Sequence, residues 1–216
     1  MIRPNFHYEL EQGSDEWLIF RSGMVTGTGL EAVLAGGTGA TRYKYLCQIA
    51  AERETRIPTP FGYENQAMRD GKEREPEGRR FYEERLEVIV EQIGFICHPS
   101  IPWFGCSPDG IILEDPMGRG LELKCPELHT FMDRVVNGTI PRGYTLQMQG
   151  LMECAALESV DFVNYFPGRP LLIQRVYRDE KLIKEIISGV KRFNDDVEEL
   201  RAKMATANYL RLEKTA

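Results

Sequence analysis

The segment Leu121–Lys124 alternates apolar and charged residues, and this alternation strongly limits what the chain can fold into. On a β-strand, successive side chains point to opposite faces of the sheet. Glu122 and Lys124 therefore share one face, and the two leucines share the other. The sequence S-P-D-G at 107–110 predicts a tight turn just before this strand, because proline fixes its own φ and glycine permits a sharp bend. A hairpin of this kind places Asp109 close to Glu122.

Each of these charged residues has an ordinary structural explanation when it is taken alone. An aspartate in S-P-D-G is typical of an Asx turn, and E-x-K on a strand is most often a solvated ion pair. Two neighbouring carboxylates repel, however, unless a proton or a cation lies between them. Asp109, Glu122 and the backbone carbonyl of Leu123 supply the oxygen ligands that Mg²⁺ takes in proteins. Lys124 beside them could orient or deprotonate a water that attacks phosphorus.

Length and composition predict one domain, residues 1–216, without a membrane span. No stretch of about eighteen apolar residues occurs, and the N-terminus lacks the apolar region of a signal peptide. The cysteines are odd in number and none are spaced C-x-x-C, which predicts reduced thiols and a cytoplasmic location. The net charge of −6 argues weakly against a nucleic-acid partner, but a local basic patch is enough for binding.

Hydrophobic periodicity predicts an α/β (α+β) fold, with a mixed sheet flanked by helices. Thr28 and Glu31 match a capping box at a helix start. We expect the strands near 103–106, 110–113 and 120–124 to form a meander with a turn at 114–120. The other expected strands are 87–99, with a break at Gly94, and the hairpin 160–166 and 171–178. The expected helices are 14–20, 42–54, 65–86 with a bend at Pro76, 127–137, 142–157 and 180–212.

Four segments resemble, in family order, the phage lambda exonuclease group, also described as YqaJ-type viral recombinases or alkaline exonucleases. They are WLIFRSGMVTGTGL from Trp17, AMRDGKEREPEGRRFYEE, SPDG with LELKCP, and YTLQMQGLME, which ends near Met152. P-D followed by E-x-K is weak as a bare pattern. The four segments together are far more specific, and they imply the PD-(D/E)xK nuclease fold. Residues 36–62 and the C-terminal stretch carry no matching motif.

The resemblance implies a role for each matched residue. Asp109, Glu122 and Glu75 would hold two Mg²⁺ ions, for which Mn²⁺ is a possible substitute, and Lys124 would serve the nucleophilic water. The positions implied for the substrate's 5′-phosphate are Arg21, Thr28, Ser107 and Gln149, and Met68 aligns near a position that wedges the DNA end.

Ordinary roles compete with several of these assignments. Glu75 alone would be a solvated helix residue between Glu73 and Glu77, Arg21 a surface ion pair, and Met68 a core methionine. Gln147 and Gln149 are two residues apart on a helix, so one of them is expected to be structural and which one meets the phosphate stays open.

The resemblance implies a Mg²⁺-dependent 5′→3′ exonuclease that degrades linear double-stranded DNA to 5′-mononucleotides. The remaining 3′ single strand would serve recombination by strand annealing. A homotrimer and a single-strand-annealing partner protein are implied in the same way, and no P-loop for ATP is present. The alternatives are an endonuclease of the same fold and a catalytically weak DNA-binding module.

Overall fold

Two β-sheets and the helices around them form the chain in the computed structural model, which describes residues 4–35, 39–59, 65–112 and 118–207. The larger sheet contains β4 (Gly110–Ile112), β5 (Arg119–Lys124), β6 (Ser159–Asn164) and β7 (Leu172–Tyr177) in that order. β5 and β6 are parallel, and the other neighbours are antiparallel. This confirms the predicted mixed sheet. The smaller antiparallel sheet has the order β1 (Asn5–His7), β2 (Phe95–Cys97) and β3 (Gly105–Cys106).

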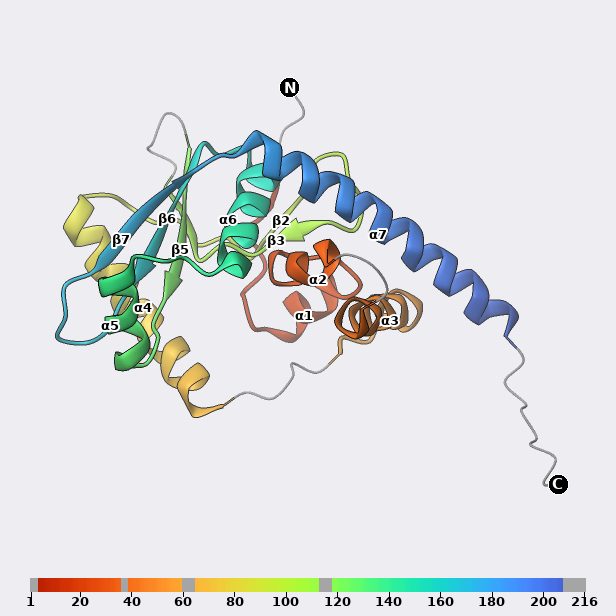
Figure 1. Cartoon of the computed structure of the whole chain (residues 1–216), viewed down its shortest axis with the longest axis horizontal. Helices are drawn as coiled ribbons and strands as arrows, with labels where there is room; N and C mark the ends of the chain where they lie inside the picture. Colours follow the sequence, from red (N-terminus) through yellow and green to blue (C-terminus); the bar gives the residue numbers. More distant parts are fainter. Residues whose placement is uncertain (1–3, 36–38, 60–64, 113–117, 208–216) are drawn as a thin grey trace.

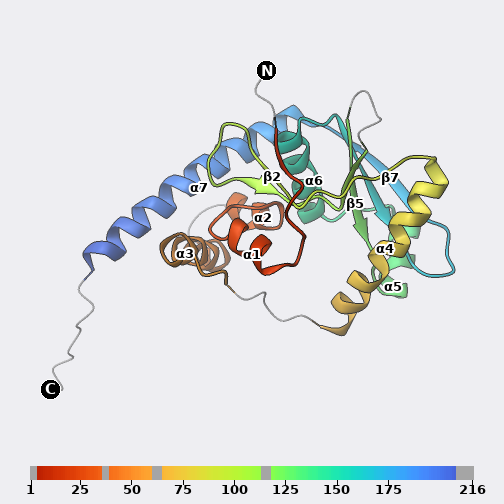
Figure 2. The same ribbon diagram turned by 180° about the vertical axis from the view of Figure 1, so that it is seen from behind.

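The helices lie on both sides of the larger sheet and beyond the smaller one (Figures 1 and 2). The connection between the parallel strands β5 and β6 contains α5 (Leu128–Asn137) and α6 (Arg142–Ala155), as a parallel crossover requires. The long helix α7 (Glu180–Thr206) runs along one side of the molecule (Figure 1). The remaining helices are α1 (Asp15–Arg21), the 3₁₀ turn η1 (Gly27–Gly29), α2 (Leu30–Leu34), α3 (Ala40–Thr55) and α4 (Gln66–Leu86). None of the helices in the described part of the chain is long and apolar enough to cross a membrane.

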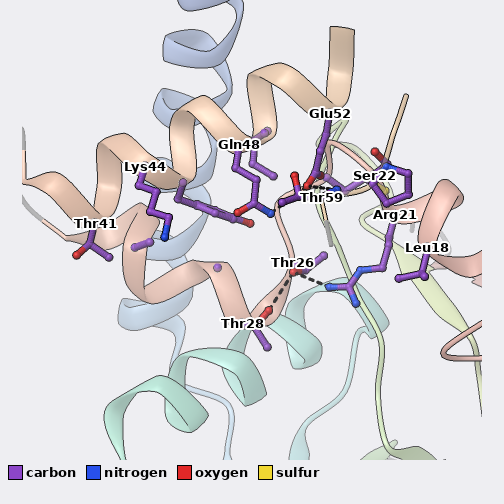
Figure 3. A pocket seen from close by; sticks show the side chains of 16 residues that line it. Leu18, Arg21, Ser22, Thr26, Thr28, Thr41, Lys44, Gln48, Glu52 and Thr59 are labelled. Atoms are coloured by element: carbon purple, nitrogen blue, oxygen red, sulfur yellow. Dashed lines mark hydrogen bonds between the residues drawn. The ribbon is translucent and has the colours of Figure 1, made fainter. Parts of the chain in front are cut away.

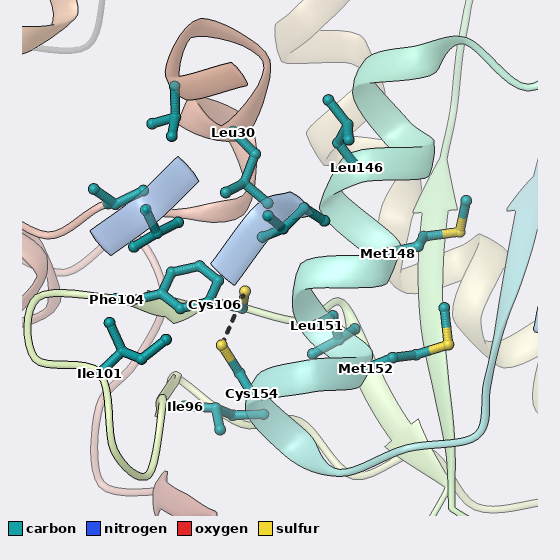
Figure 4. Close-up of a cluster of buried hydrophobic side chains, with 14 of the residues drawn as sticks. Leu30, Ile96, Ile101, Phe104, Cys106, Leu146, Met148, Leu151, Met152 and Cys154 are labelled. Carbon is teal, nitrogen blue, oxygen red and sulfur yellow. Dashed lines mark hydrogen bonds between the residues drawn. The ribbon is translucent and has the colours of Figure 1, made fainter. Parts of the chain in front are cut away.

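Two apolar cores cover the two faces of the larger sheet. Helix α4 packs Tyr82 against Leu121 and Leu123 of β5 on one face. Helix α6 packs on the other face, where its apolar side chains also meet α2, α3, α7 and the smaller sheet (Figure 4). The thiols of Cys106 and Cys154 touch inside this second core, with their sulfur atoms 3.8 Å apart and no disulfide between them. β5 is therefore buried on both sides, and its charged residues need partners.

A buried ion-pair group ties α4 to two strands of the larger sheet. The Asp161 side chain on β6 is fully buried. Its carboxylate accepts hydrogen bonds from the Tyr82 hydroxyl at 2.7 Å and from Nε and Nη2 of Arg175 at 2.7 and 2.9 Å. Because Tyr82 lies on α4 and Arg175 on β7, this group holds the helix that carries Glu75 against the sheet.

The predicted meander does not form. β4 and β5 make the expected hairpin, but β3 pairs with β2 in the other sheet. The segment 87–99 also passes between sheets, since Glu91 bridges Ile111 of β4 while only Phe95–Cys97 form a strand. The break falls at Gly94 as predicted, where the Leu10 carbonyl oxygen would lie 2.0 Å from an added Cβ.

The predicted capping box is wrong. Thr28 lies inside the η1 turn, the N-cap of α2 is Gly29, and no side chain caps that helix. The Tyr45 hydroxyl presses against Gly29, only 2.1 Å from where a Cβ would stand. A side chain at position 29 would collide with this hydroxyl, and the Thr28 side chain is exposed.

The other predicted helices and the β6–β7 hairpin are confirmed to within a few residues. Ser14 caps α1 by accepting a hydrogen bond from the Trp17 amide at 3.2 Å, and α4 continues through Pro76. Residue 113, most of the predicted turn at 114–120 and the predicted helical residues 208–212 lie outside the described residues.

We predict that Asp161→Ala lowers the free energy of unfolding by about 1–3 kcal/mol, because it removes the acceptor of the buried Tyr82 hydroxyl and the ion-pair partner of Arg175, whose side chain is 38% exposed. Urea denaturation followed by circular dichroism measures this. Glu199→Ala is the matched control, since its ion pair with Lys203 at 2.6 Å is exposed and should leave stability almost unchanged. An Asp161→Ala variant as stable as the control would contradict this account.

Candidate active site

Glu122 and Lys124 lie on the same face of β5, as the alternation predicts. The Lys124 Nζ atom is 2.7 Å from Oε1 of Glu122, whose residue is only 1% exposed. This face meets α6, because the neighbouring Gly120 lies directly against Leu151 of that helix. The pair is therefore buried beneath a helix, and the explanation of a solvated surface pair does not apply.

Asp109 joins this pair from the segment between β3 and β4. Its Oδ2 atom accepts a hydrogen bond from the Leu123 amide at 2.7 Å and lies 3.5 Å from Lys124 Nζ. β4 begins at Gly110, so the aspartate takes the place of the next strand residue beside β5. The N–H and C=O of one strand residue point to the same side. The Leu123 carbonyl therefore also faces the side of Asp109.

Glu75 approaches the same group from α4. Residues two apart on a helix point in nearly opposite directions, and Glu73 and Glu77 are exposed while Glu75 is partly buried. Burial and the nearby charge of Asp109 raise the pKa of Glu75 to about 7, against a smaller opposing effect of Lys124. The protonation of Glu75 therefore depends on the charges of Asp109 and of Lys124 on β5. We call Asp109, Glu122, Lys124 and Glu75 the carboxylate cluster.

The charges of the carboxylate cluster are strongly coupled. Burial raises the pKa of Glu122 to about 7, Lys124 opposes this rise, and Asp109 adds to it. Burial alone would lower the pKa of Lys124, but Asp109 and Glu122 outweigh that effect and raise it. Lys124 is therefore an ammonium group that donates a hydrogen bond to Asp109 and forms an ion pair with Glu122, and in this state it cannot accept a proton from water.

The carboxylate cluster fits a hard divalent cation in the chemistry of its donors. Three carboxylates and the Leu123 carbonyl are oxygen ligands of the kind such ions take. Two of the carboxyl groups, Glu75 and Glu122, have pKa values near 7 because a single ammonium does not fully compensate their buried charge. Among the described residues, no group of three His, Cys, Asp or Glu side chains already converges on one point.

A cavity of about 370 Å³ lies between α1, η1 and α3 and contains two of the residues predicted to bind a terminal phosphate (Figure 3). Arg21 Nη2 donates to the Thr26 hydroxyl at 3.3 Å, and the Thr26 and Thr28 hydroxyls are 3.3 Å apart. The guanidinium lies 4.2 Å from the centre of the Trp17 ring, and burial lowers its pKa. We call this the Arg21 cavity.

Ser107 is connected to Arg21 through Trp17. The Trp17 Nε1–H group donates to the Ser107 hydroxyl at 3.2 Å and to the Gly94 carbonyl at 2.9 Å, while the ring lies against the guanidinium. Ser107 is also two residues before Asp109 along the chain. The S-P-D segment thus links the carboxylate cluster to the wall that supports Arg21.

The structure does not place Gln149 with Arg21 and Thr28. Gln149 is 2% exposed, and its amide donates to the Tyr177 carbonyl and accepts from the Asp179 amide, both at 2.9 Å. Gln147 instead points to the site, where its Nε2 atom donates to Glu122 Oε2 at 3.2 Å. The assignment of Gln149 is corrected accordingly, because its side chain is fully occupied in joining α6 to the end of β7.

Gln147 links the two parts of the site. Its Cγ atom would lie 2.8 Å from a Cβ on Gly27, so the side chain packs directly on the η1 turn that carries Thr28. Its amide reaches Glu122 at the same time. Gln147 therefore connects Glu122 of the carboxylate cluster to the η1 turn, whose Thr28 lines the Arg21 cavity.

Comparison with known proteins places the chain in a family. Residues 16–158 match the YqaJ-like viral recombinase domain. The chain belongs to this family. It is 32% identical to LHK-Exo, an alkaline exonuclease from Laribacter hongkongensis, with a TM-score of 0.78 over 89% of this chain and 98% of that one. The LHK-Exo complex with dAMP gives a TM-score of 0.79 at the same identity.

Two further relatives are more distant. A phage-related exonuclease from Haemophilus somnus shares the fold, with a TM-score of 0.66 at 15% identity over 84% of this chain and 96% of that one. The uncharacterized protein R354 of Acanthamoeba polyphaga mimivirus is 30% identical over 168 residues. That match covers 72% of this chain but only 29% of the viral protein.

Helix α3 contributes residues to the site of this family member that the motifs did not indicate. Lys44 and Gln48 line the Arg21 cavity together with Thr26 (Figure 3). Glu52 closes it, accepting from the Gly23 amide at 2.8 Å and from Gln48 at 2.9 Å. Lys44, Gln48 and Glu52 are spaced four apart, which places them on one helix face. This four-residue spacing of polar residues is visible in the sequence and could have indicated a polar helix face, although the segment carries no family motif.

Met68 lies in the first turn of α4 and is 52% exposed, so it is not a core methionine. Asn65 caps this helix end by accepting from the Met68 amide at 2.8 Å. The proposed contact with a DNA end therefore remains a prediction for an exposed side chain.

We expect Gln147 and Gln149 to have different roles, one in turnover and the other in stability. Gln149→Ala should lower the free energy of unfolding by about 1–3 kcal/mol, since it leaves buried backbone groups unpaired. Gln147→Ala should leave stability nearly unchanged and reduce turnover. Thermal melts and single-turnover assays on the same two variants measure both effects. The reverse pattern, with Gln149 controlling turnover and Gln147 controlling stability, would restore the assignment made from sequence.

Proposed function

We propose that this protein is a Mg²⁺-dependent 5′→3′ exonuclease that degrades linear double-stranded DNA to 5′-mononucleotides. The observation that carries the proposal is the contact of Gln147 with both Glu122 and the η1 turn. It puts a candidate phosphate pocket next to a candidate hydrolytic centre. An enzyme that removes terminal nucleotides needs both sites at this short separation.

The carboxylate cluster is the proposed hydrolytic centre. Asp109, Glu122, Glu75 and the Leu123 carbonyl would hold two Mg²⁺ ions, or Mn²⁺ in their place, which polarise the phosphoryl group and lower the pKa of bound water. Lys124 would orient the attacking water and neutralise charge that develops on the phosphoryl oxygens. Its ammonium form suits this electrostatic role better than the role of a general base.

The Arg21 cavity is the proposed site of the terminal 5′-phosphate. A guanidinium can form two parallel bonds to a phosphate, and the hydroxyls of Thr26 and Thr28 add neutral donors. Ser107 supports this site through Trp17 and does not line the cavity.

The wider role is proposed from the family and from the alkaline exonuclease LHK-Exo. The 3′ single strand left by the enzyme would be used in recombination by an annealing protein. A homotrimer around the DNA would let an acidic subunit stay on its substrate by enclosure. An endonuclease of the same fold, or a catalytically weak DNA-binding module, is the alternative.

Loss of a single member of the carboxylate cluster should abolish hydrolysis. Asp109→Asn, Glu122→Gln and Lys124→Met remove a charge with little change in shape, and we expect linear duplex DNA to remain intact with each. Wild-type protein should digest linear DNA with Mg²⁺, leave it intact with EDTA, and spare closed circular DNA. Cleavage of circular DNA would favour the endonuclease. A Lys124→Met variant with wild-type turnover would contradict the proposed centre.

Arg21 should determine the response to the DNA end. A charge-assisted contact contributes roughly 1.5–3 kcal/mol, so Arg21→Gln should slow digestion of 5′-phosphorylated ends by about ten- to a hundredfold. It should also remove the preference over 5′-hydroxyl ends. Initial rates on duplexes that differ only at the 5′ terminus measure this. Equal wild-type rates on both ends, or attack from 3′ ends, would rule out the phosphate pocket.

A further inference from the structure

A second cavity, of about 390 Å³, lies beside the carboxylate cluster between the last turn of α5 and the first turn of α6. Thr28 and Gln147 line its inner edge, so it adjoins both the Arg21 cavity and Glu122. Arg134 and Arg142 bring two positive charges to its wall, and Glu31 brings one negative charge. We call it the Arg134 cavity.

Arg134 is a buried cation without a carboxylate partner among the described residues. It is 8% exposed, and Asn164 is its hydrogen-bond acceptor through the side-chain oxygen. Its guanidinium also lies 5.4 Å from the centre of the Tyr144 ring. A guanidinium carries five N–H donors, and a buried charge is costly unless it is paired. The cavity therefore presents a buried positive charge that a bound anion would compensate.

The first turn of α6 adds a second attraction for an anion. Its N-cap is Pro141, and no side chain caps the helix. The amides of Arg142 and Gly143 belong to the first turn, whose N–H groups have no partner within the helix. Since the positive end of the helix dipole lies there, the turn favours a phosphate. The exposed Arg142 side chain has no ion pair within the described part of the chain.

We infer that the Arg134 cavity binds an internucleotide phosphate of the degraded strand, the one on the 3′ side of the scissile phosphate. This rests on the proposed function. Lys124 Nζ and the Arg134 guanidinium lie 5.5 and 5.4 Å from the centre of the same Tyr144 ring, so the two cations are near neighbours. The phosphate on the 5′ side is the terminal one, assigned to Arg21. The phosphate on the 3′ side is therefore the one that the Arg134 cavity would bind.

The test combines arginine variants, which lack one positive charge, with DNA in which one phosphate is replaced by an uncharged methylphosphonate. Duplexes with a 5′-phosphate would carry one uncharged methylphosphonate, either at the linkage after the scissile one or at a linkage further inside. Wild-type protein should release the first nucleotide about tenfold more slowly from the first substrate than from the second. Arg134→Gln and Arg142→Gln should be slow on unmodified DNA and should not respond to the first methylphosphonate.

Binding measured in EDTA separates this inference from the proposed function. By fluorescence anisotropy, Arg142→Gln should reduce the slope of log affinity against log salt by roughly 0.9, as expected for one lost phosphate contact. Glu31→Gln should tighten binding because it removes the negative charge of the cavity. Arg192→Gln is the matched control, since this exposed arginine lies on α7, outside the cavity.

The outcomes are distinct. If neither Arg142→Gln nor Glu31→Gln changes binding, or if the arginine variants remain as sensitive to the methylphosphonate as wild type, the Arg134 cavity does not hold this phosphate. If binding changes as expected but no nucleotide is released from any DNA end, the anion site stands and the exonuclease proposal fails. Should Arg134→Gln not fold, Arg142→Gln and Glu31→Gln still decide the matter.

Discussion

The hydrogen bond from the Leu123 amide to the Asp109 carboxylate is the contact on which the site depends. β4 begins at Gly110, directly after Asp109, so the carboxylate takes the place of a strand partner of β5 and brings the S-P-D segment against the charged face of that strand. The same segment carries Ser107, which supports Trp17 and through it Arg21. One side-chain contact thus positions both the carboxylate cluster and the wall of the Arg21 cavity.

Lys124 supplies the positive charge that offsets the negative charges of Asp109 and Glu122. The Asp109 and Glu122 carboxylates both lie within ion-pair distance of Lys124, whose ammonium group provides the charge that offsets their repulsion. The compensation is incomplete, because Glu75 and Glu122 have pKa values near 7. The cluster therefore favours additional positive charge, and we propose that this remaining imbalance would be the physical basis of metal binding.

The sequence predicts the parts of the site that depend on local geometry. Strand alternation placed Glu122 with Lys124, and the tight turn placed Asp109 beside them. What it could not predict depends on tertiary packing. The hydrogen bonds of Gln149 go to the end of β7, which lies far along the chain. The capping box at Thr28 does not form because Thr28 lies inside the η1 turn and Gly29 is the N-cap of α2. The predicted meander did not form because β3 pairs with β2 in the smaller sheet, and this pairing is set by tertiary packing.

Calorimetric titration with Mg²⁺ at pH 7, in two buffers of different ionisation enthalpy, tests the central claim most directly. Glu75 and Glu122 have pKa values of about 7, so each is roughly half protonated at that pH. Metal binding requires the ionised form. The account predicts that Mg²⁺ binding releases protons at pH 7 and releases fewer at pH 8. Mg²⁺ binding without proton release at pH 7 would contradict it.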